Sequence, residues 1–249
     1  FLGTFTSWLH GYIANPFLGF IINKSIDMPD RKLKIIDSSC DSDFLSNFKT
    51  KYSYGKLEKI QANYFSYDIK IKKFRYNDGR ENRNELEFAN QYQLKNEYIE
   101  DDLKKTKSKF WRRNFFTYDD IEYLTYYLLK NKPFIAKYLA KRFPFVIIDE
   151  CQDLSYVQLS ILNGLHKYGT RIHLVGDLNQ AIYSFRNIEP ADTKSFINQN
   201  QFKEMRLIEN YRSNQAIVDI SGRVVNRKNY VVGKKEQTTN NPLVALLYK

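Results

Sequence analysis

Two adjacent carboxylates, Asp149 and Glu150, directly follow an apolar run at Phe145–Ile148. A continuous apolar run is typical of a strand that is buried in a parallel sheet and covered on both faces. Ligands of open α/β sheets bind just beyond the carboxyl ends of the strands, where these side chains are expected. One carboxylate there suits binding Mg²⁺ near a phosphate, and the other suits orienting or deprotonating a water molecule. The alternative is a solvated strand end without chemistry.

A second apolar segment, Arg171–Gly176, also ends in an acidic residue, Asp177, and Gln180 follows it. A helix is expected over about 155–167, and it supplies the crossover that a parallel strand pair requires. Both strands then bring polar groups to one edge of one sheet. This agreement between two segments favours a ligand site over a solvated strand end.

Four segments resemble motifs of the UvrD/Rep/PcrA group of superfamily 1 DNA helicases, in that family's order. Residues 146–153, Val-Ile-Ile-Asp-Glu-Cys-Gln-Asp, resemble its Walker B segment. Residues 174–186, Leu-Val-Gly-Asp-Leu-Asn-Gln-Ala-Ile-Tyr-Ser-Phe-Arg, resemble the next motif, which couples nucleotide to DNA. Residues 207–213, Leu-Ile-Glu-Asn-Tyr-Arg-Ser, resemble the motif that opens the second motor domain. Residues 3–8, Gly-Thr-Phe-Thr-Ser-Trp, resemble a DNA-contacting motif near the start of the first domain.

The resemblance implies ATP and Mg²⁺ as cofactors and gives roles to the residues at the sheet edge. Asp149 is expected to ligate Mg²⁺ and to bind the nucleotide through it. Glu150 is expected to act in catalysis by activating the attacking water. Asp177 and Gln180 are expected to sense the γ-phosphate and Mg²⁺, with Gln180 as a catalytic residue.

The resemblance also implies that Tyr211 stacks on adenine and that Arg212 reaches the γ-phosphate as an arginine finger. A guanidinium neutralises charge on the transferred phosphoryl group, and from another domain it makes hydrolysis depend on domain closure. By itself, the sequence from Asn210 to Ser213 is most typical of a cap for a helix that runs to about Asn226. The three other motifs favour the functional interpretation.

Five residues are DNA-contact candidates by resemblance. The hydroxyls of Thr4 and Ser7 suit phosphate oxygens, and Trp8 suits stacking on a base. The alternative for this segment is a capped helix with Trp8 in the core. Phe185 matches an aromatic residue that stacks on a DNA base, and Arg186 lies beside it in the same motif.

A basic segment with interleaved aromatic residues lies at 104–113. Lys109, Trp111 and Arg112 fit contacts with a DNA backbone and stacking on bases. The alternative is a solvated helix end that its dipole favours.

Local patterns predict further elements. Strands are expected over Phe1–Phe5, Tyr64–Tyr76 and Met205–Ile208, and Thr6 or Ser7 is expected to cap the helix after the first of them. Apolar spacing predicts an amphipathic helix from about 84 to 110. Thr117 and the two acids that follow Tyr118 have the pattern of a capping box for the next helix.

The predicted fold class is α/β, with a RecA-like parallel sheet of the P-loop NTPase type, a mainly helical insertion and the start of a second RecA-like domain. By position, the first motor domain comprises residues 1–12 and 115–204. The inserted subdomain comprises residues 13–114, and the second motor domain begins over 205–249.

The sequence contains no Gly-x-x-x-x-Gly-Lys-Ser/Thr loop, whose backbone N–H groups would cradle phosphates. In the resembled family this loop lies upstream of residues 3–8. The chain opens at Phe1 without a methionine before Met28, so we expect it to be cut or processed from a longer protein. An intact loop upstream would favour a motor, and a degenerate loop would favour a scaffold.

The composition narrows the class of partner. The 249 residues are 43% hydrophobic and 27% charged, which is typical of a globular chain. The net charge of +11 favours a polyanion, with nucleic acid as the first candidate and a membrane surface as the alternative. Cys40 and Cys151 have no disulfide or metal spacing, and Cys151 is expected to be a small buried residue. No run is long enough to span a bilayer, and no signal peptide is found. The two cysteines fit an intracellular, reducing location, so a cytoplasmic protein is expected.

The sequence therefore predicts an ATP-dependent helicase or translocase on single-stranded DNA or DNA junctions, moving 3′ to 5′ by family, in repair, recombination or defence. The alternative is a non-catalytic DNA-binding subunit that keeps the helicase shape and holds a nuclease partner. An unrelated basic α/β protein is a third interpretation, and four ordered motifs make it the weakest.

Overall fold

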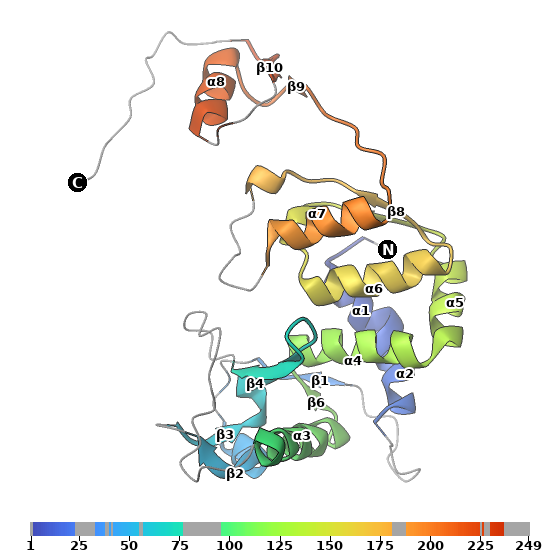
Figure 1. Cartoon of the computed structure of the whole chain (residues 1–249), viewed down its shortest axis with the longest axis vertical. Helices are drawn as coiled ribbons and strands as arrows, with labels where there is room; N and C mark the ends of the chain where they lie inside the picture. Colours follow the sequence, from blue (N-terminus) through green and yellow to red (C-terminus); the bar gives the residue numbers. More distant parts are fainter. Residues whose placement is uncertain are drawn as a thin grey trace, which may run out of the picture. The chain divides into compact units, whose positions relative to one another are not determined.

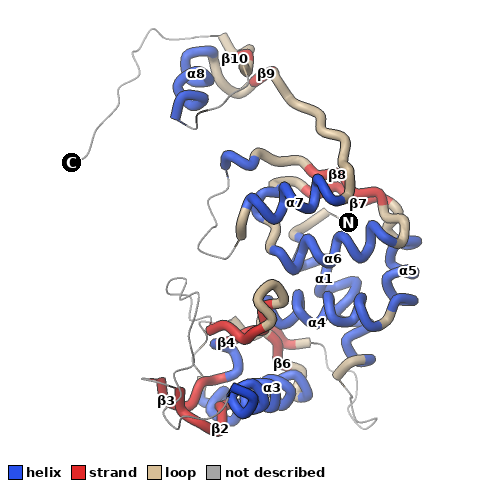
Figure 2. The backbone as a smooth tube through the Cα atoms, viewed as in Figure 1, coloured by secondary structure: helices blue, strands red, loops and turns tan. Residues whose placement is uncertain are grey.

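The structure of the protein is a computed structural model that describes most of the chain. The described residues are 2–22, 33–37, 40, 42–54, 57–76, 96–180, 188–224, 226 and 230–236. The chain divides into two compact units, Phe1–Gln199 and Asn200–Lys249. Both units contain helices and short parallel strand pairs, so the fold is mixed α/β (Figure 2).

The first unit opens with helical segments that run end to end: α1 (Phe5–Leu9), η1 (His10–Ala14), α2 (Asn15–Phe17) and η2 (Leu18–Phe20). Thr4 caps α1, because its Oγ1 accepts from the Ser7 N–H at 3.2 Å. The strand predicted over Phe1–Phe5 is therefore wrong, and the cap is Thr4 rather than Thr6 or Ser7. This hydroxyl starts the helix earlier than the apolar pattern indicates.

The next elements are β1 (Lys34–Ile35), η3 (Asp43–Phe48), β2 (Lys49–Tyr54), β3 (Leu57–Gln61), η4 (Ala62–Tyr64), β4 (Phe65–Asp68), β5 (Lys73–Tyr76) and α3 (Asn96–Arg112). β2 pairs with β3, and β4 pairs with β5, both antiparallel. The described part of the predicted insertion thus holds two hairpins in addition to its helices. The predicted helix starts at Asn96 among the described residues, and the rest of its predicted span lies outside them.

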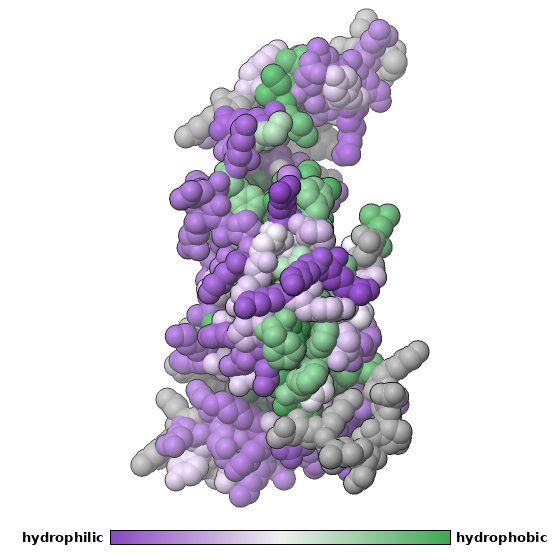
Figure 3. All heavy atoms as spheres, turned by 90° about the vertical axis from the view of Figure 1, so that its right-hand side faces the viewer, coloured by the Kyte–Doolittle hydropathy of each residue, from purple (hydrophilic) through white to green (hydrophobic). Residues whose placement is uncertain are grey.

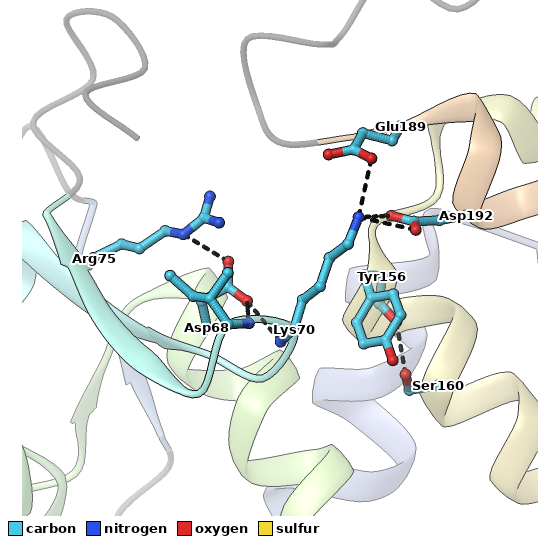
Figure 4. A network of polar contacts seen from close by, with 8 residues as sticks. Asp68, Lys70, Arg75, Tyr156, Ser160, Glu189 and Asp192 are labelled. Carbon is cyan, nitrogen blue, oxygen red and sulfur yellow. Dashed lines mark hydrogen bonds and ion pairs between the residues drawn. The ribbon is translucent and has the colours of Figure 1, made fainter. Parts of the chain in front are cut away.

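The segment predicted as one strand over Tyr64–Tyr76 is a hairpin. Asp68 Oδ1 accepts from the backbone N–H groups of Lys70 and Ile71 at 2.7 and 3.2 Å, which reverses the chain. The Lys70 ammonium at the hairpin tip lies 2.8 Å from Asp192 and 3.0 Å from Glu189 (Figure 4). The hairpin is thereby joined to the start of the helix that contains Asp192.

Two helices, α4 (Tyr118–Asn131) and α5 (Pro133–Arg142), follow β6 (Phe115–Phe116), which pairs with β1 in parallel. The predicted capping box is confirmed. Thr117 Oγ1 accepts from the Asp120 N–H at 3.2 Å, and Asp120 Oδ2 accepts from the Thr117 N–H at 3.0 Å.

The predicted strand–helix–strand segment is confirmed. Its elements and those that follow are β7 (Phe145–Ile148), η5 (Cys151–Asp153), α6 (Tyr156–Lys167), β8 (Arg171–Leu174), η6 (Leu178–Gln180) and α7 (Pro190–Gln199). β7 and β8 are parallel, with Ile148 opposite Leu174. The prediction that β7 is covered on both faces is wrong for the described residues, because the Phe145 and Ile147 side chains are 52% and 61% exposed. Alternate residues of β7 are partly buried, so one face of this strand pair packs on the unit.

The main hydrophobic core of the first unit lies between α1, η1, α4, α5 and α6 (Figure 1). A patch of hydrophobic side chains remains on the surface that carries α5 and α2 (Figure 3). Phe20, Phe134 and Tyr138 are exposed aromatic residues of η2 and α5, and their rings contact one another or Phe17. None of the described helices combines the length and apolar character that a membrane span needs.

The second unit contains β9 (Glu209–Asn210), α8 (Gln215–Val224) and β10 (Val232–Gly233), and its two strands are parallel. The strand predicted over Met205–Ile208 is wrong, because the strand pair begins only at Glu209. Asn210 Oδ1 accepts from two following backbone N–H groups and forms a turn, not a helix cap. The cap of α8 is Asn214, whose Oδ1 accepts from the Ile217 N–H at 3.1 Å.

A buried ion pair joins α3 to the start of α4. Lys107 Nζ lies 2.7 Å from Asp120 Oδ1, and the two side chains are 0% and 1% exposed. Lys107 Nζ also lies 5.1 Å from the centre of the Phe65 ring and 5.7 Å from that of Phe110. Burial lowers the pKa of Lys107, and the Asp120 carboxylate opposes this shift.

We expect Asp120→Asn to lower the free energy of unfolding by about 3–5 kcal/mol, because it leaves the Lys107 ammonium buried without its counter-charge. Urea unfolding followed by tryptophan fluorescence measures this. The double variant Lys107→Met with Asp120→Asn is the control, because it removes the charge as well as its partner, and it should recover much of the loss. A double variant no more stable than Asp120→Asn would contradict this account.

Candidate functional site

The loop after β7 presents two exposed carboxylates at the edge of the sheet. Glu150 has φ 52° and ψ 46°, a left-handed conformation that is uncommon for a residue other than glycine. Its backbone N–H donates to Asp149 Oδ1 at 2.9 Å. The backbone thus turns sharply at Glu150, the predicted catalytic residue. Strained backbone conformations of this kind are common at functional sites.

Gln152 links the ends of the two parallel strands. Its Nε2 donates to Glu150 Oε2 at 2.6 Å, and its Oε1 accepts from the Asp177 N–H at 3.1 Å. The Gln152 side chain is buried, so it fixes the Glu150 carboxylate relative to the loop after β8. Sequence reasoning gave Gln152 no role, although it lies within the segment that resembles Walker B.

Gly176 allows the two loops to approach this closely. A Cβ at this position would lie 2.3 Å from Gln152 Oε1 and 2.9 Å from Cys151 Sγ. The Cys151 N–H donates to the Val175 carbonyl at 2.9 Å, and Cys151 is buried, as predicted. Burial raises the pKa of its thiol, so this residue is a packing element rather than a nucleophile.

Asp177 and Gln180 lie in the loop after β8 and contact each other. Asp177 Oδ2 accepts from Gln180 Nε2 at 3.1 Å, and Asp177 Oδ1 accepts from the Asn179 N–H at 3.0 Å. The structure therefore brings Glu150 and Asp177 to one edge through Gln152, with Gln180 beside Asp177. Phe185 and Arg186, from the same motif, lie outside the described residues.

Oxygen ligands for a metal are present at this edge, but the described residues contain no group of three or more His, Cys, Asp or Glu that could hold one. Mg²⁺ keeps several waters and binds through one or two carboxylates together with substrate phosphates. The exposed Asp149 carboxylate fits that mode of binding, in which nucleotide and water supply most ligands.

Tyr211 and Arg212 lie in the second unit and are exposed. The Tyr211 hydroxyl donates to the Glu209 carboxylate, and the Arg212 backbone N–H donates to Asn210 Oδ1 at 2.9 Å. The Tyr211 hydroxyl and then the Lys234 ammonium hold the pKa of Glu209 below its usual range. Both predicted nucleotide contacts are thus presented at the surface of their unit.

The N-terminus of α1 presents two of its three DNA-contact candidates. The Thr4 and Ser7 hydroxyls are exposed, and their oxygens lie 2.7 Å apart. Trp8 is only 7% exposed and packs against Phe5 and Phe143, with ring centroids 5.7 and 5.2 Å away. This burial favours the alternative in which Trp8 is a core residue.

The basic end of α3 is only partly free for a ligand. Lys109 Nζ donates to the Asn47 carbonyl at 3.0 Å, and Lys107 is buried. The half-buried Trp111 ring lies 6.2 Å from that of Tyr123. Arg112 is exposed. Two of the three predicted contacts, Lys109 and Arg112, are thus exposed cations, and the ammonium of Lys109 is also bonded to the Asn47 carbonyl.

Glu122 is a buried carboxylate that the sequence did not single out. It lies on α4, is 8% exposed, and accepts from Gln158 Nε2 at 2.6 Å, the Ser155 hydroxyl at 3.2 Å and the Thr6 hydroxyl at 3.3 Å. Burial, and then the Asp119 charge, raise the pKa of Glu122 to about 7. The three hydrogen-bond partners of Glu122 come from two other helices and are distant in sequence, so only the tertiary structure shows this buried network.

Comparison with known proteins identifies the family. Residues 18–201, which are most of the chain, match the family described as "UvrD/REP helicase N-terminal domain". The chain belongs to the UvrD/Rep helicase family. The resemblance drawn from its four sequence motifs is thereby confirmed.

Several relatives of this UvrD/Rep chain carry helicase names. The chain is 32% identical to the ATP-dependent DNA helicase PcrA of Leuconostoc citreum over 124 residues, 49% of this chain and 17% of that protein. It is 27% identical to the exonuclease/helicase subunit RexA of Lactococcus lactis subsp. cremoris (strain MG1363) over 201 residues, 78% of this chain and 15% of that protein. It is 31% identical to DNA helicase II of Escherichia coli (strain K12) over 106 residues, 42% of this chain and 15% of that protein. The matched segments thus span less than a fifth of each of these relatives.

We expect Gly176→Ala to destabilise the chain, because the new Cβ would meet Gln152 Oε1 and the backbone N of Cys151 at 2.3 and 3.0 Å. Gly164→Ala is the matched control, because it lies in α6 with nothing within 4 Å of the new Cβ. In a helix this change should stabilise by roughly 0.5–1 kcal/mol. Thermal unfolding of both variants measures the difference, and a Gly176→Ala variant as stable as Gly164→Ala would disprove the close approach.

We expect the stability gap between Glu122→Gln and the natural chain to depend on pH. The folded-state pKa of Glu122, about 7, lies above the usual 4.5, so the stability that its protonated form contributes is lost as pH rises between these values. Glutamine does not titrate. As pH rises across this window, the free energy of unfolding of Glu122→Gln should therefore increase by on the order of 3 kcal/mol relative to that of the natural chain. Urea unfolding at about pH 5 and about pH 8 tests this. An equal gap at both pH values would refute the assignment.

Proposed function

We propose that the whole protein is an ATP-driven helicase or translocase that moves on single-stranded DNA or DNA junctions, in the 3′-to-5′ direction of its family. The observation that carries this proposal is the edge of the β7–β8 pair, where Gln152 holds Glu150 to the loop that begins at Asp177. Family membership and relatives named as ATP-dependent DNA helicases support it. The process served is DNA repair, recombination or defence.

The proposed role of each residue follows from the chemistry of its side chain. Asp149 would hold Mg²⁺, which would neutralise charge on the phosphates of ATP. Glu150 would orient and deprotonate the attacking water from the position that Gln152 fixes. Asp177 and Gln180 would respond to the γ-phosphate and Mg²⁺ beside them.

The second unit would complete the site. Tyr211 would stack on adenine, and Arg212 would reach the γ-phosphate. Both side chains are exposed at the surface of their unit, as a contact made on domain closure requires. Hydrolysis would then depend on closure, because the guanidinium comes from a different unit.

DNA would contact the first unit at the N-terminus of α1, where the exposed Thr4 and Ser7 hydroxyls suit phosphate oxygens. Arg112 supplies an exposed cation at the end of α3, near Lys109 and Trp111 in sequence. The net charge of +11 supports a polyanionic partner. The proposed roles of Phe185 and Arg186 come from the resemblance alone.

We propose domain boundaries and a RecA-like fold on the same basis. Residues 1–12 and 115–204 would belong to the first RecA-like domain, residues 13–114 to its insertion, and residues 205–249 to the second domain. The parallel β7–α6–β8 segment supports the RecA-like assignment, because it has the crossover that such sheets repeat.

A second candidate is a DNA-binding component of a nuclease or defence complex that does not hydrolyse ATP. It is favoured by the relative named exonuclease/helicase subunit RexA, which matches 78% of this chain. The same relative makes a nuclease a candidate partner for an active motor.

In the complete natural protein, Glu150→Gln should retain ATP binding and abolish most turnover, because the amide keeps the shape of the side chain but cannot accept a proton. ATP hydrolysis with single-stranded DNA and binding of a fluorescent ATP analogue measure the two properties. Glu100→Gln is the control, since this partly exposed carboxylate on α3 pairs with Lys104 of the same helix. Undiminished hydrolysis by Glu150→Gln would refute the catalytic role. A natural protein that binds DNA without hydrolysing ATP would favour the second candidate.

A further inference from the structure

Glu122 contacts the starts of two helices, α1 and α6. Through Thr6 it contacts the first turn of α1, whose exposed Thr4 and Ser7 are the proposed DNA contacts. Through Ser155 and Gln158 it contacts the start of α6. The carboxylate itself lies on α4 and is buried between these elements.

The contacts of Glu122 with α6 are made to the cap of that helix. Ser155 and Gln158 form the α6 capping box, in which each side chain accepts from the other residue's backbone N–H. A carboxylate at this helix end is favoured by the dipole of a 12-residue helix. No ion pair with Glu122 occurs among the described parts of the chain, so its partners are these hydrogen-bond donors.

The α6 cap lies close in sequence to the proposed catalytic loop. Only Leu154 separates Ser155 from η5, the short helix that contains Cys151 and Gln152. Gln152 in turn holds Glu150. A displacement of the α6 cap therefore reaches the catalytic carboxylate through a short, hydrogen-bonded stretch of chain.

We propose that Glu122 is a positioning residue through which DNA bound at the N-terminus of α1 sets the geometry of the catalytic loop after β7. This inference rests on the proposed ATP-driven motor. DNA that shifts α1 moves the Thr6 hydroxyl, and Glu122 passes this movement to the α6 cap. The consequence is that Glu122 controls how strongly DNA stimulates ATP hydrolysis, not the binding of DNA itself.

Position between two sites does not by itself establish coupling, so the test must separate coupling from stability. Thr6→Val keeps the size of the side chain and removes only the hydrogen bond from α1. Glu122→Leu removes all three bonds, and Glu122→Gln retains the ability to accept from Gln158 and to bond Ser155. Ser160→Ala is the matched control, because its hydroxyl donates to the Tyr156 carbonyl within α6.

ATP hydrolysis would be measured as a function of oligo-dT concentration. The proteins compared are the complete natural protein, these single variants and the double variant Thr6→Val, Glu122→Leu. Thr6→Val and Glu122→Leu should each lower the maximal stimulation by DNA roughly tenfold, the scale of one lost hydrogen bond to a charged group. For Thr6→Val, which leaves the bonds of Glu122 to the α6 cap in place, the rate without DNA and the half-saturating DNA concentration should stay within about twofold. Glu122→Gln and Ser160→Ala should keep most of the stimulation. The double variant should lose no more than Glu122→Leu alone.

Two outcomes would overturn the inference: full stimulation in Thr6→Val and Glu122→Leu, or an equal fall in the rates with and without DNA, which indicates general destabilisation. If Glu122→Leu does not fold, Thr6→Val alone decides, because it leaves the carboxylate and the α6 cap in place. A natural protein that hydrolyses ATP without any response to DNA would reject the proposed motor function itself. That result differs from a stimulated protein whose variants are unaffected, which rejects only the role of Glu122.

Discussion

Packing of the first unit depends on the buried ion pair between Lys107 and Asp120. It joins α3 to α4, and the same Asp120 carboxylate closes the α4 capping box. The Lys107 ammonium also lies near the Phe65 and Phe110 rings, which belong to two separate hydrophobic clusters. A charge buried this deeply is tolerated only when its partner is in place. The second hairpin, α3 and the start of α4 therefore have to assemble together. The predicted insertion is fixed to the rest of the unit by this buried ion pair and by the contacts of Lys70 with Asp192 and Glu189.

Environment, rather than residue type, separates the roles of the carboxylates in this unit. Asp120 is buried beside a cation and serves the fold. Glu122 is buried two residues later beside neutral donors, with a pKa of about 7, so its charge changes near neutral pH. Asp149 and Glu150 are exposed at the end of a parallel strand, where a metal ion and a water molecule can reach them. A sequence shows four acidic residues, but only their surroundings distinguish an ion-pair partner from a buried hydrogen-bond acceptor or an exposed ligand.

The sequence predicted those elements whose signals are local. The Thr117 capping box and the strand–helix–strand order around Asp149 follow from short patterns, and the structure confirms them. The hairpin at Asp68 was missed because the apolar alternation continues across a turn that a side chain makes. The strand predicted over Met205–Ile208 failed because apolar character alone does not supply a pairing partner. Glu122 was missed because its partners come from other helices, and the role of Gln152 was missed because it also depends on Asp177 from the loop after β8.

The residues proposed to act on the nucleotide come from both compact units. At the end of β7, the left-handed backbone of Glu150, its hydrogen bond from Gln152 and the space left by Gly176 fix the position of the Glu150 carboxylate. Tyr211 and Arg212 belong to the other compact unit. A rigid half-site supplies preorganised charge, while a half-site on a separate body makes turnover conditional on closure. In the proposed motor, DNA therefore has two routes to control hydrolysis. It can bring the units together, and it can act within the first unit through the helix end that Glu122 contacts.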